Sequence, residues 1–162
     1  AVMKALYKKL NKDQNSEDED KWGLVGLLHD ADYELTKDTP EKHTIVLEEK
    51  IGKMIEQDVM HAIQSHNWQR NGVEPKNLMD WSIYCCDELT GLIVAAALVH
   101  PDKKLSSIDV NFIMNRFNEN SFARGADREM IKTCEEKLGI PLNEFIDINL
   151  SAMQGISSQL GL

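Results

Sequence analysis

The stretch LMDWSIYCCDELTGLIVAAALV, residues 78–99, decides the fold of this chain. Its apolar residues are too dense to form a single stripe, so the segment predicts a long helix that is apolar on most of its faces. Pro101 ends it, because proline lacks a backbone N–H and clashes with the preceding turn. A helix of this kind must be surrounded by others. We therefore expect residues 78–99 to lie at the centre of the molecule.

Shorter helical patterns precede and follow this central segment. Ser16 and Glu19 have the spacing of a capping box, and Thr39 with Pro40 is typical of another helix start. No segment alternates with the period of a strand. We predict an all-α, single-domain helical bundle of about six to eight helices over residues 1–162. Residues 1–101 would form its core and residues 102–162 would pack on that core. The expected flanking helices are 1–10, 16–29, 40–51, 57–66, 108–117, 127–138 and 141–154, with a loop at 67–76.

Length and charge limit the classes of function. A chain of 162 residues can bury one sizeable core without a disulfide or a structural metal. Its net charge of -9 argues against nucleic acid as a partner, because phosphate backbones are bound by clusters of Lys and Arg. Homo-oligomerisation is left open by these data.

The cellular compartment of the protein is predicted from its cysteines and its hydropathy. Three cysteines, two of them adjacent (Cys85, Cys86 and Cys134), favour reduced thiols over a disulfide framework. The most apolar run, Leu89–Val99, is shorter than the roughly 20 residues that cross a bilayer. No basic leader with an apolar segment precedes the first helix. We therefore expect a cytoplasmic protein with no membrane partner.

Histidines and aspartates carry the chemical signal. Four of the five histidines lie between residues 29 and 66, and His29 is followed directly by Asp30 at the end of an apolar run. Asp87 lies within the central apolar helix, where its carboxylate loses hydration unless a cation or hydrogen-bond donors meet it. Divalent metals use these residue types as ligands. The alternative for each residue alone is a helix cap, an ion pair or a place on the surface.

The order of these residues resembles the HD-domain superfamily of metal-dependent phosphohydrolases, most closely its small stand-alone members. The resemblance covers nearly the whole chain and implies metal ligands at His29, Asp30 and Asp87. It also implies one further histidine on the first helix, which this sequence lacks; either that helix begins before residue 1 or the site is degenerate. The similar stretches are GLLHDADYE (26–34), PEKH (40–43), HAIQSHN (61–67) and CDELTG (86–91), continuing from 121–123 to 153–154.

The resemblance further implies hydrolysis of a phosphoester by a metal-activated water, with one or two divalent ions per chain (Mn, Fe, Co, Ni, Zn or Mg). Asp30 would both bind the ion and steer the water. His43, His61 and His66 would hold a second ion, and His61 or His66 would alternatively orient phosphate or protonate the leaving oxygen. Asp32 and Glu34 either orient a ligating imidazole or belong to a solvated acidic loop.

The range of possible substrates is limited mainly by motifs that the sequence lacks. The sequence has no glycine-rich phosphate loop and no Gly-Tyr-Pro after the histidines, so we expect a small phosphorylated substrate, with nucleotides among the candidates. The competing hypothesis is a regulatory or scaffolding HD domain that performs no hydrolysis. Candidate phosphate-binding cations, each otherwise a solvated surface residue, are Lys103, Lys104, Arg124 and Arg128.

Overall fold

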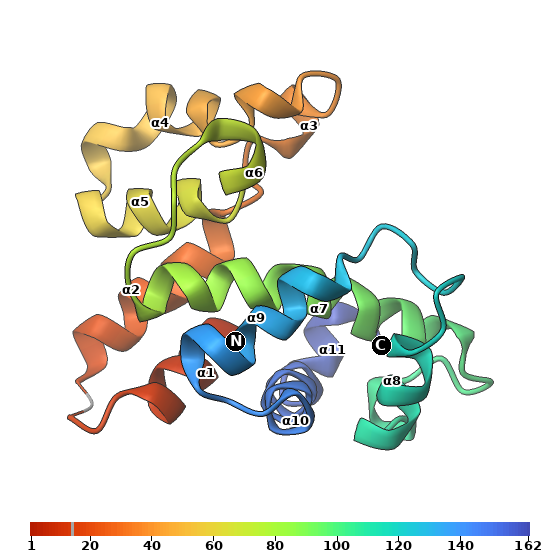
Figure 1. The fold of residues 1–162 in the computed structure, drawn as a ribbon. Helices are drawn as coiled ribbons and strands as arrows, with labels where there is room; N and C mark the ends of the chain where they lie inside the picture. Colours follow the sequence, from red (N-terminus) through yellow and green to blue (C-terminus); the bar gives the residue numbers. More distant parts are fainter. Residues whose placement is uncertain (14) are drawn as a thin grey trace.

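Helix α7 (Leu78–Val99) crosses the middle of the molecule, with other helices on both sides of it (Figure 1). It begins at Asn77, whose side chain accepts the backbone N–H groups of Met79 and Asp80. Its long apolar surface is covered: Leu89, Leu92 and many of its other apolar residues are buried. The predicted central helix is thus confirmed, and it is the element on which the site is built.

The structure, a computed structural model, describes residues 1–13 and 15–162, so residue 14 of the predicted domain lies outside the described residues. In that part of the chain every regular element is helical, which confirms the all-α prediction. The elements before α7 are α1 (Val2–Leu10), α2 (Ser16–Leu28), α3 (Tyr33–Thr36), the 3₁₀ turn η1 (Pro40–Lys42), α4 (Ile45–Ile51), η2 (Gly52–Met54), α5 (Gln57–Ser65) and α6 (Trp68–Asn71). Those after it are η3 (Leu105–Ser107), α8 (Val110–Phe117), α9 (Arg128–Leu138), α10 (Leu142–Gln154) and α11 (Ser157–Leu160).

The helices form two layers around α7. Figure 1 shows α3, α4, α5 and α6 on one side of it, and α1, α8 and α10 on the other. One apolar cluster joins residues from both ends of the chain, for example Leu6 of α1, Ile131 of α9 and Phe145 of α10. The residues after Pro101 therefore share their core with those before it.

Local details differ from the sequence prediction at several places, and the short helices α3 and α11 were not predicted. Asn15, and not Ser16, caps α2, because its side chain accepts the N–H of Asp18. The predicted loop 67–76 contains the short helix α6. The predicted helix 40–51 is broken into η1 and α4, since Thr44 adopts the left-handed conformation with φ 72°. This break turns His43 into the protein, where it is buried.

Helix α7 is also long and apolar enough to cross a membrane, which corrects the estimate made from residues 89–99 alone. However, 56% of its most apolar window is buried by the protein itself. The core helix of a soluble protein passes the same test, so this feature is weak evidence for a membrane.

Candidate metal centre

The side chains of His29 and Asp30 lie close together at the C-terminal end of α2. The last residue of α2 is Leu28, and the backbone N–H of His29 still bonds the carbonyl of Val25 as the helix closes. Consecutive residues of a continuing helix point about 100° apart. In the turn at 29–32 that follows α2, Nε2 of His29 lies close both to Oδ2 of Asp30 and to Oδ1 of Asp87 on α7.

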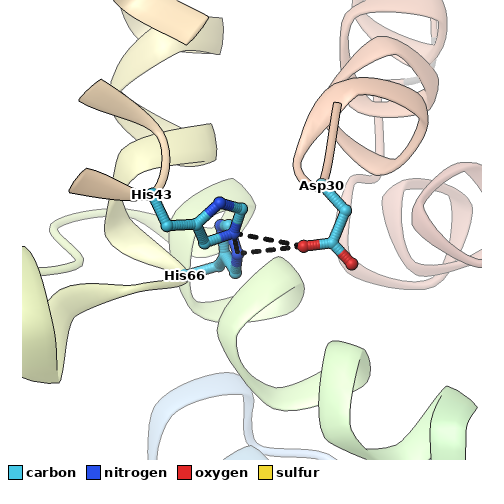
Figure 2. Close-up of side chains that lie close together, drawn as sticks. All are labelled: Asp30, His43 and His66. Carbon is cyan, nitrogen blue, oxygen red and sulfur yellow. Dashed lines mark hydrogen bonds and ion pairs between the residues drawn. The ribbon is translucent and has the colours of Figure 1, made fainter. Parts of the chain in front are cut away.

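One group of possible ligands consists of Asp30, His43 and His66. Figure 2 shows the Asp30 carboxylate directed at the two imidazoles, which come from the opposite side of the site. Oδ1 of Asp30 lies 3.1 Å from Nε2 of His43 and 3.9 Å from Nε2 of His66. The two Nε2 atoms are 3.0 Å apart.

A second group consists of His29, Asp30 and Asp87. Nε2 of His29 lies 3.5 Å from Oδ2 of Asp30 and 3.3 Å from Oδ1 of Asp87. Asp30 therefore belongs to both groups and presents one oxygen to each. The side chain of Asp30 is 52% exposed, whereas the imidazoles around it are largely covered.

The three imidazoles are held in one orientation by their Nδ1 atoms. Nδ1 of His29 faces the carbonyl of Gly26 at 3.2 Å, and Nδ1 of His66 faces the carbonyl of Ile63. Nδ1 of His43 faces Oδ1 of Asp32 at 2.7 Å. Since carbonyl and carboxylate oxygens only accept, each Nδ1 carries the hydrogen. The Nε2 lone pairs are then left for the centre, which is the arrangement that metal-binding histidines require.

Asp32 is the anchor of His43. It is 1% exposed, and its second oxygen accepts the backbone N–H groups of Thr44 at 2.9 Å and Leu47 at 3.0 Å. The sequence left two alternatives for Asp32 and Glu34. Asp32 contacts an imidazole, whereas Glu34 is exposed and pairs with Lys37.

The facing Nε2 atoms of His43 and His66 test whether a metal fits. Two lone pairs at 3.0 Å repel unless a proton or a cation lies between them. Two nitrogens bound at about 2.1 Å to one ion, about 90° apart, would be separated by about 3.0 Å. The donor set and this distance therefore fit a divalent cation.

Charge and burial act in opposite directions on the imidazoles. Burial disfavours protonation of His29, but the hydrogen bond and charge of Asp87 outweigh it and raise the pKa of His29. Burial likewise opposes protonation of His43, and Asp30 and Asp32 raise its pKa. Burial lowers the pKa of His66. The hydrogen bond to His43 lowers the pKa of Asp30, which keeps this shared carboxylate ionised.

A cavity of about 410 Å³ opens beside the first group. It extends from the candidate ligands to a wall formed by the α6 region, α7, the loop before α9 and the first turn of α9. Arg70 also lines this cavity, although it was not predicted from the sequence. Its position four residues after His66 could have indicated it, but the segment was expected to be a loop. The lining residues of that wall are Asn67, Gln69, Arg70, Glu88, Gly125, Asp127 and Met130.

His61 lies apart from both groups, against expectation. Its Nδ1 lies 2.9 Å from Oδ2 of Asp80, and it borders a different cavity together with Glu48 and Gln64. His61 and His66 are five residues apart, so they point about 140° away from each other around α5. The predicted roles of His61 as ligand, phosphate-orienting group or acid therefore have no support in the geometry.

The predicted phosphate-binding cations are also not gathered at the site. The guanidinium of Arg128 donates to the backbone carbonyls of Phe117, Phe122, Ala123 and Ala126, so its hydrogens hold the loop before α9. Lys103 and Lys104 follow the end of α7, which is about 18 Å along the helix from Asp87. Arg124 is exposed, next to Gly125 of the cavity wall.

No histidine occurs on α1, where the resemblance implies one. Ala1 nevertheless lines a second cavity, of about 250 Å³, together with His29 and Asp87. The first turn of α1 therefore borders the second ligand group.

Comparison with known proteins adds no relative: no protein-family model matches this chain, and no curated protein or solved structure matches it. The HD-domain resemblance stays a prediction.

Proposed function

We propose that this protein is a metal-dependent phosphohydrolase that cleaves small phosphoesters. One observation carries the proposal: two groups of imidazole and carboxylate ligands share Asp30 and lie at the edge of a cavity of about 410 Å³. A structural ion pair needs one histidine and one carboxylate. Three imidazoles with oriented Nε2 atoms exceed that need and suit a site for metal ions.

Two ions fit the sharing of Asp30. His43 and His66 with Oδ1 of Asp30 would hold one ion, and His29 and Asp87 with Oδ2 would hold the other. The first group offers two imidazole nitrogens and the second offers one, so Mn, Fe, Co, Ni or Zn suits the first group better than Mg, which prefers oxygen. Divalent ions bound here would lower the pKa of water and neutralise charge on a phosphoryl group.

The residues of the chain have separate roles in this proposal. Asp32 and the carbonyls of Gly26 and Ile63 keep the imidazoles oriented. Arg70, on the cavity wall, is placed to bind phosphate oxygens, and arginine suits this through its two parallel N–H groups. His66 acts as a ligand and not as an acid, since its Nε2 faces His43 and Asp30.

The test is metal reconstitution. Protein stripped with a chelator is loaded separately with Mn, Fe, Co, Ni, Zn or Mg, and phosphate release from p-nitrophenyl phosphate is measured. We expect one or two ions per chain by elemental analysis, and phosphate release only from the loaded protein. Protein that binds no divalent ion would overturn the proposal. Bound ions without phosphate release across a nucleotide and sugar-phosphate panel would instead support the regulatory or scaffolding domain.

A further inference from the structure

We propose that the preferred substrate is a phosphomonoester whose alcohol portion carries a protonated amino group. This inference rests on the proposed function and concerns the same cavity. It is drawn from the cavity residues that are not candidate ligands, among them Glu88 and Asp127 with Asn67, Gln69 and Arg70.

The charges around the cavity favour a cationic group on the alcohol portion. Two bound divalent ions would offset Asp30, Asp87 and the two charges of a phosphomonoester. The wall then retains two carboxylates, Glu88 and Asp127, against one guanidinium, that of Arg70, among the described lining residues. A second or third phosphate on the substrate would approach these carboxylates and be repelled. A cationic group on the alcohol portion would be attracted to them.

The side-chain amides that line the cavity offer hydrogen-bond acceptors. The amide nitrogen of Asn67 already donates to the carbonyls of Pro40 at 3.1 Å and His43 at 3.4 Å. The amide nitrogen of Gln69 donates to the hydroxyl of Tyr84 at 3.1 Å. No described hydrogen bond uses the oxygen of either amide, so both oxygens stay available as acceptors.

Glu88 adds a further acceptor to this wall. Its Oε2 accepts the backbone N–H of Asp127 at 3.1 Å, which fixes the carboxylate against the loop before α9. That contact leaves Oε1 as an acceptor. An ammonium group has three donors and no acceptor, so it complements a wall rich in accepting oxygens better than a hydroxyl group does.

The volume of the cavity limits the size of the substrate. A cavity of about 410 Å³ lies at the small end of the range for small-molecule sites, roughly 300–1,000 Å³. It suits one phosphorylated small molecule together with the ions. Gly125 and Met130 supply the less polar part of the lining, against which a short carbon chain or sugar ring packs.

The experiment compares matched substrates on the metal-loaded full chain. kcat/KM for phosphate release is measured for glucosamine 6-phosphate against glucose 6-phosphate, and for 2-aminoethyl phosphate against 2-hydroxyethyl phosphate. We expect a preference of at least about tenfold for the amino compound of each pair, the size of one charge-assisted hydrogen bond. ADP is expected to be a poorer substrate than AMP.

Variants assign the preference to the wall. Glu88→Gln is expected to reduce the amino-to-hydroxyl ratio to near one. Asp127→Asn, which keeps an N-cap side chain for α9, is expected to reduce it as well and serves if the first variant fails to fold. The matched control is Glu129→Gln, which removes an exposed charge two residues beyond Asp127 that pairs with Lys132. This control should retain the full ratio.

The outcomes separate the two proposals. Absence of metal-dependent phosphate release from p-nitrophenyl phosphate and from every amino and hydroxyl substrate tested overturns the proposed function and this inference with it. Release from p-nitrophenyl phosphate with an amino-to-hydroxyl ratio near one, or with a ratio that survives Glu88→Gln and Asp127→Asn, overturns this inference alone.

Discussion

Of two histidines that lie near aspartates, one within α5 and one directly after it, only one belongs to the candidate metal site. His66, directly after α5, faces Asp30 and His43 at the edge of an open cavity. His61, within α5, faces Asp80, which is 0% exposed and also accepts the N–H of Lys76. Nδ1 of His61 and the N–H of Lys76 both meet Oδ2 of Asp80, which leaves Nε2 of His61 and Oδ1 of Asp80 buried without a hydrogen-bond partner. One imidazole and one carboxylate form a structural pair, whereas three imidazoles around a shared carboxylate beside an open cavity form a candidate centre.

The largest effect is expected from Asp30→Ala, because Asp30 contributes to both ligand groups. We expect loss of both ions and a fall in kcat/KM of at least about 10³-fold, as for removal of a central electrostatic group. Elemental analysis and phosphate release measure the two effects. Glu34→Ala, which removes an exposed carboxylate nearby, is the control and should behave as wild type. A variant at Asp30 that keeps both ions would break the comparison.

Asp87→Ala sharpens the comparison by separating the two groups. Asp87 contacts His29 but belongs only to the second group, so we expect one of two ions to be lost while the first group keeps its own. The ion count per chain would fall from about two to about one. Retention of both ions, with the fold intact by circular dichroism, would move the second ion away from α7.

Asp32→Asn is expected to have an intermediate effect, since it leaves every ligand in place. The asparagine amide keeps one accepting oxygen but carries no negative charge. In the wild type this charge orients His43 and favours a hydrogen on its Nδ1. Loss of such an orienting partner weakens metal affinity by about 10–100-fold. Competition with a chelator of known affinity would measure this. An unchanged affinity would mean that the buried carboxylate serves only the backbone of α4.

Arg128→Gln tests the reassignment of this arginine from phosphate binding to support of the loop. We expect the free energy of unfolding to fall by about 2–3 kcal/mol, because several backbone carbonyls lose a charged donor. Arg124→Gln, an exposed change in the same loop, should stay within about 0.5 kcal/mol. Urea unfolding gives both values. Equal stability of the two variants, with a raised KM only for Arg128→Gln, would restore the phosphate-binding role.

The smallest effect on the site is expected from His61→Ala. Asp80 would keep one backbone donor but lose its imidazole, at a cost of about 1–3 kcal/mol in the free energy of unfolding. Metal content and kcat/KM should be unchanged at temperatures where the variant is folded. If ions were lost from folded His61→Ala protein, His61 and His66 would no longer be distinct in function.

Helical periodicity determined much of this protein from sequence alone, because it is a local property. The dense apolar pattern at 78–99 predicted the central helix, and the end of an apolar run at His29 predicted where a helix would stop. The carboxylate of Asp87 in that helix was sufficient to expect a partner, and His29 lies within 3.3 Å of it, whereas the fully buried Asp80 of the same helix was not singled out.

Tertiary packing alone decided which histidines converge. The inward turn of His43 depends on the left-handed backbone of Thr44, and the choice of His66 over His61 depends on how α5 is rotated against α7. The partners of Arg128 are backbone carbonyls of a folded loop, which no pattern of side chains encodes. Sequence determines which face of a helix is apolar. The directions of its polar side chains acquire chemical meaning only when other helices bring their own polar groups within a few ångströms.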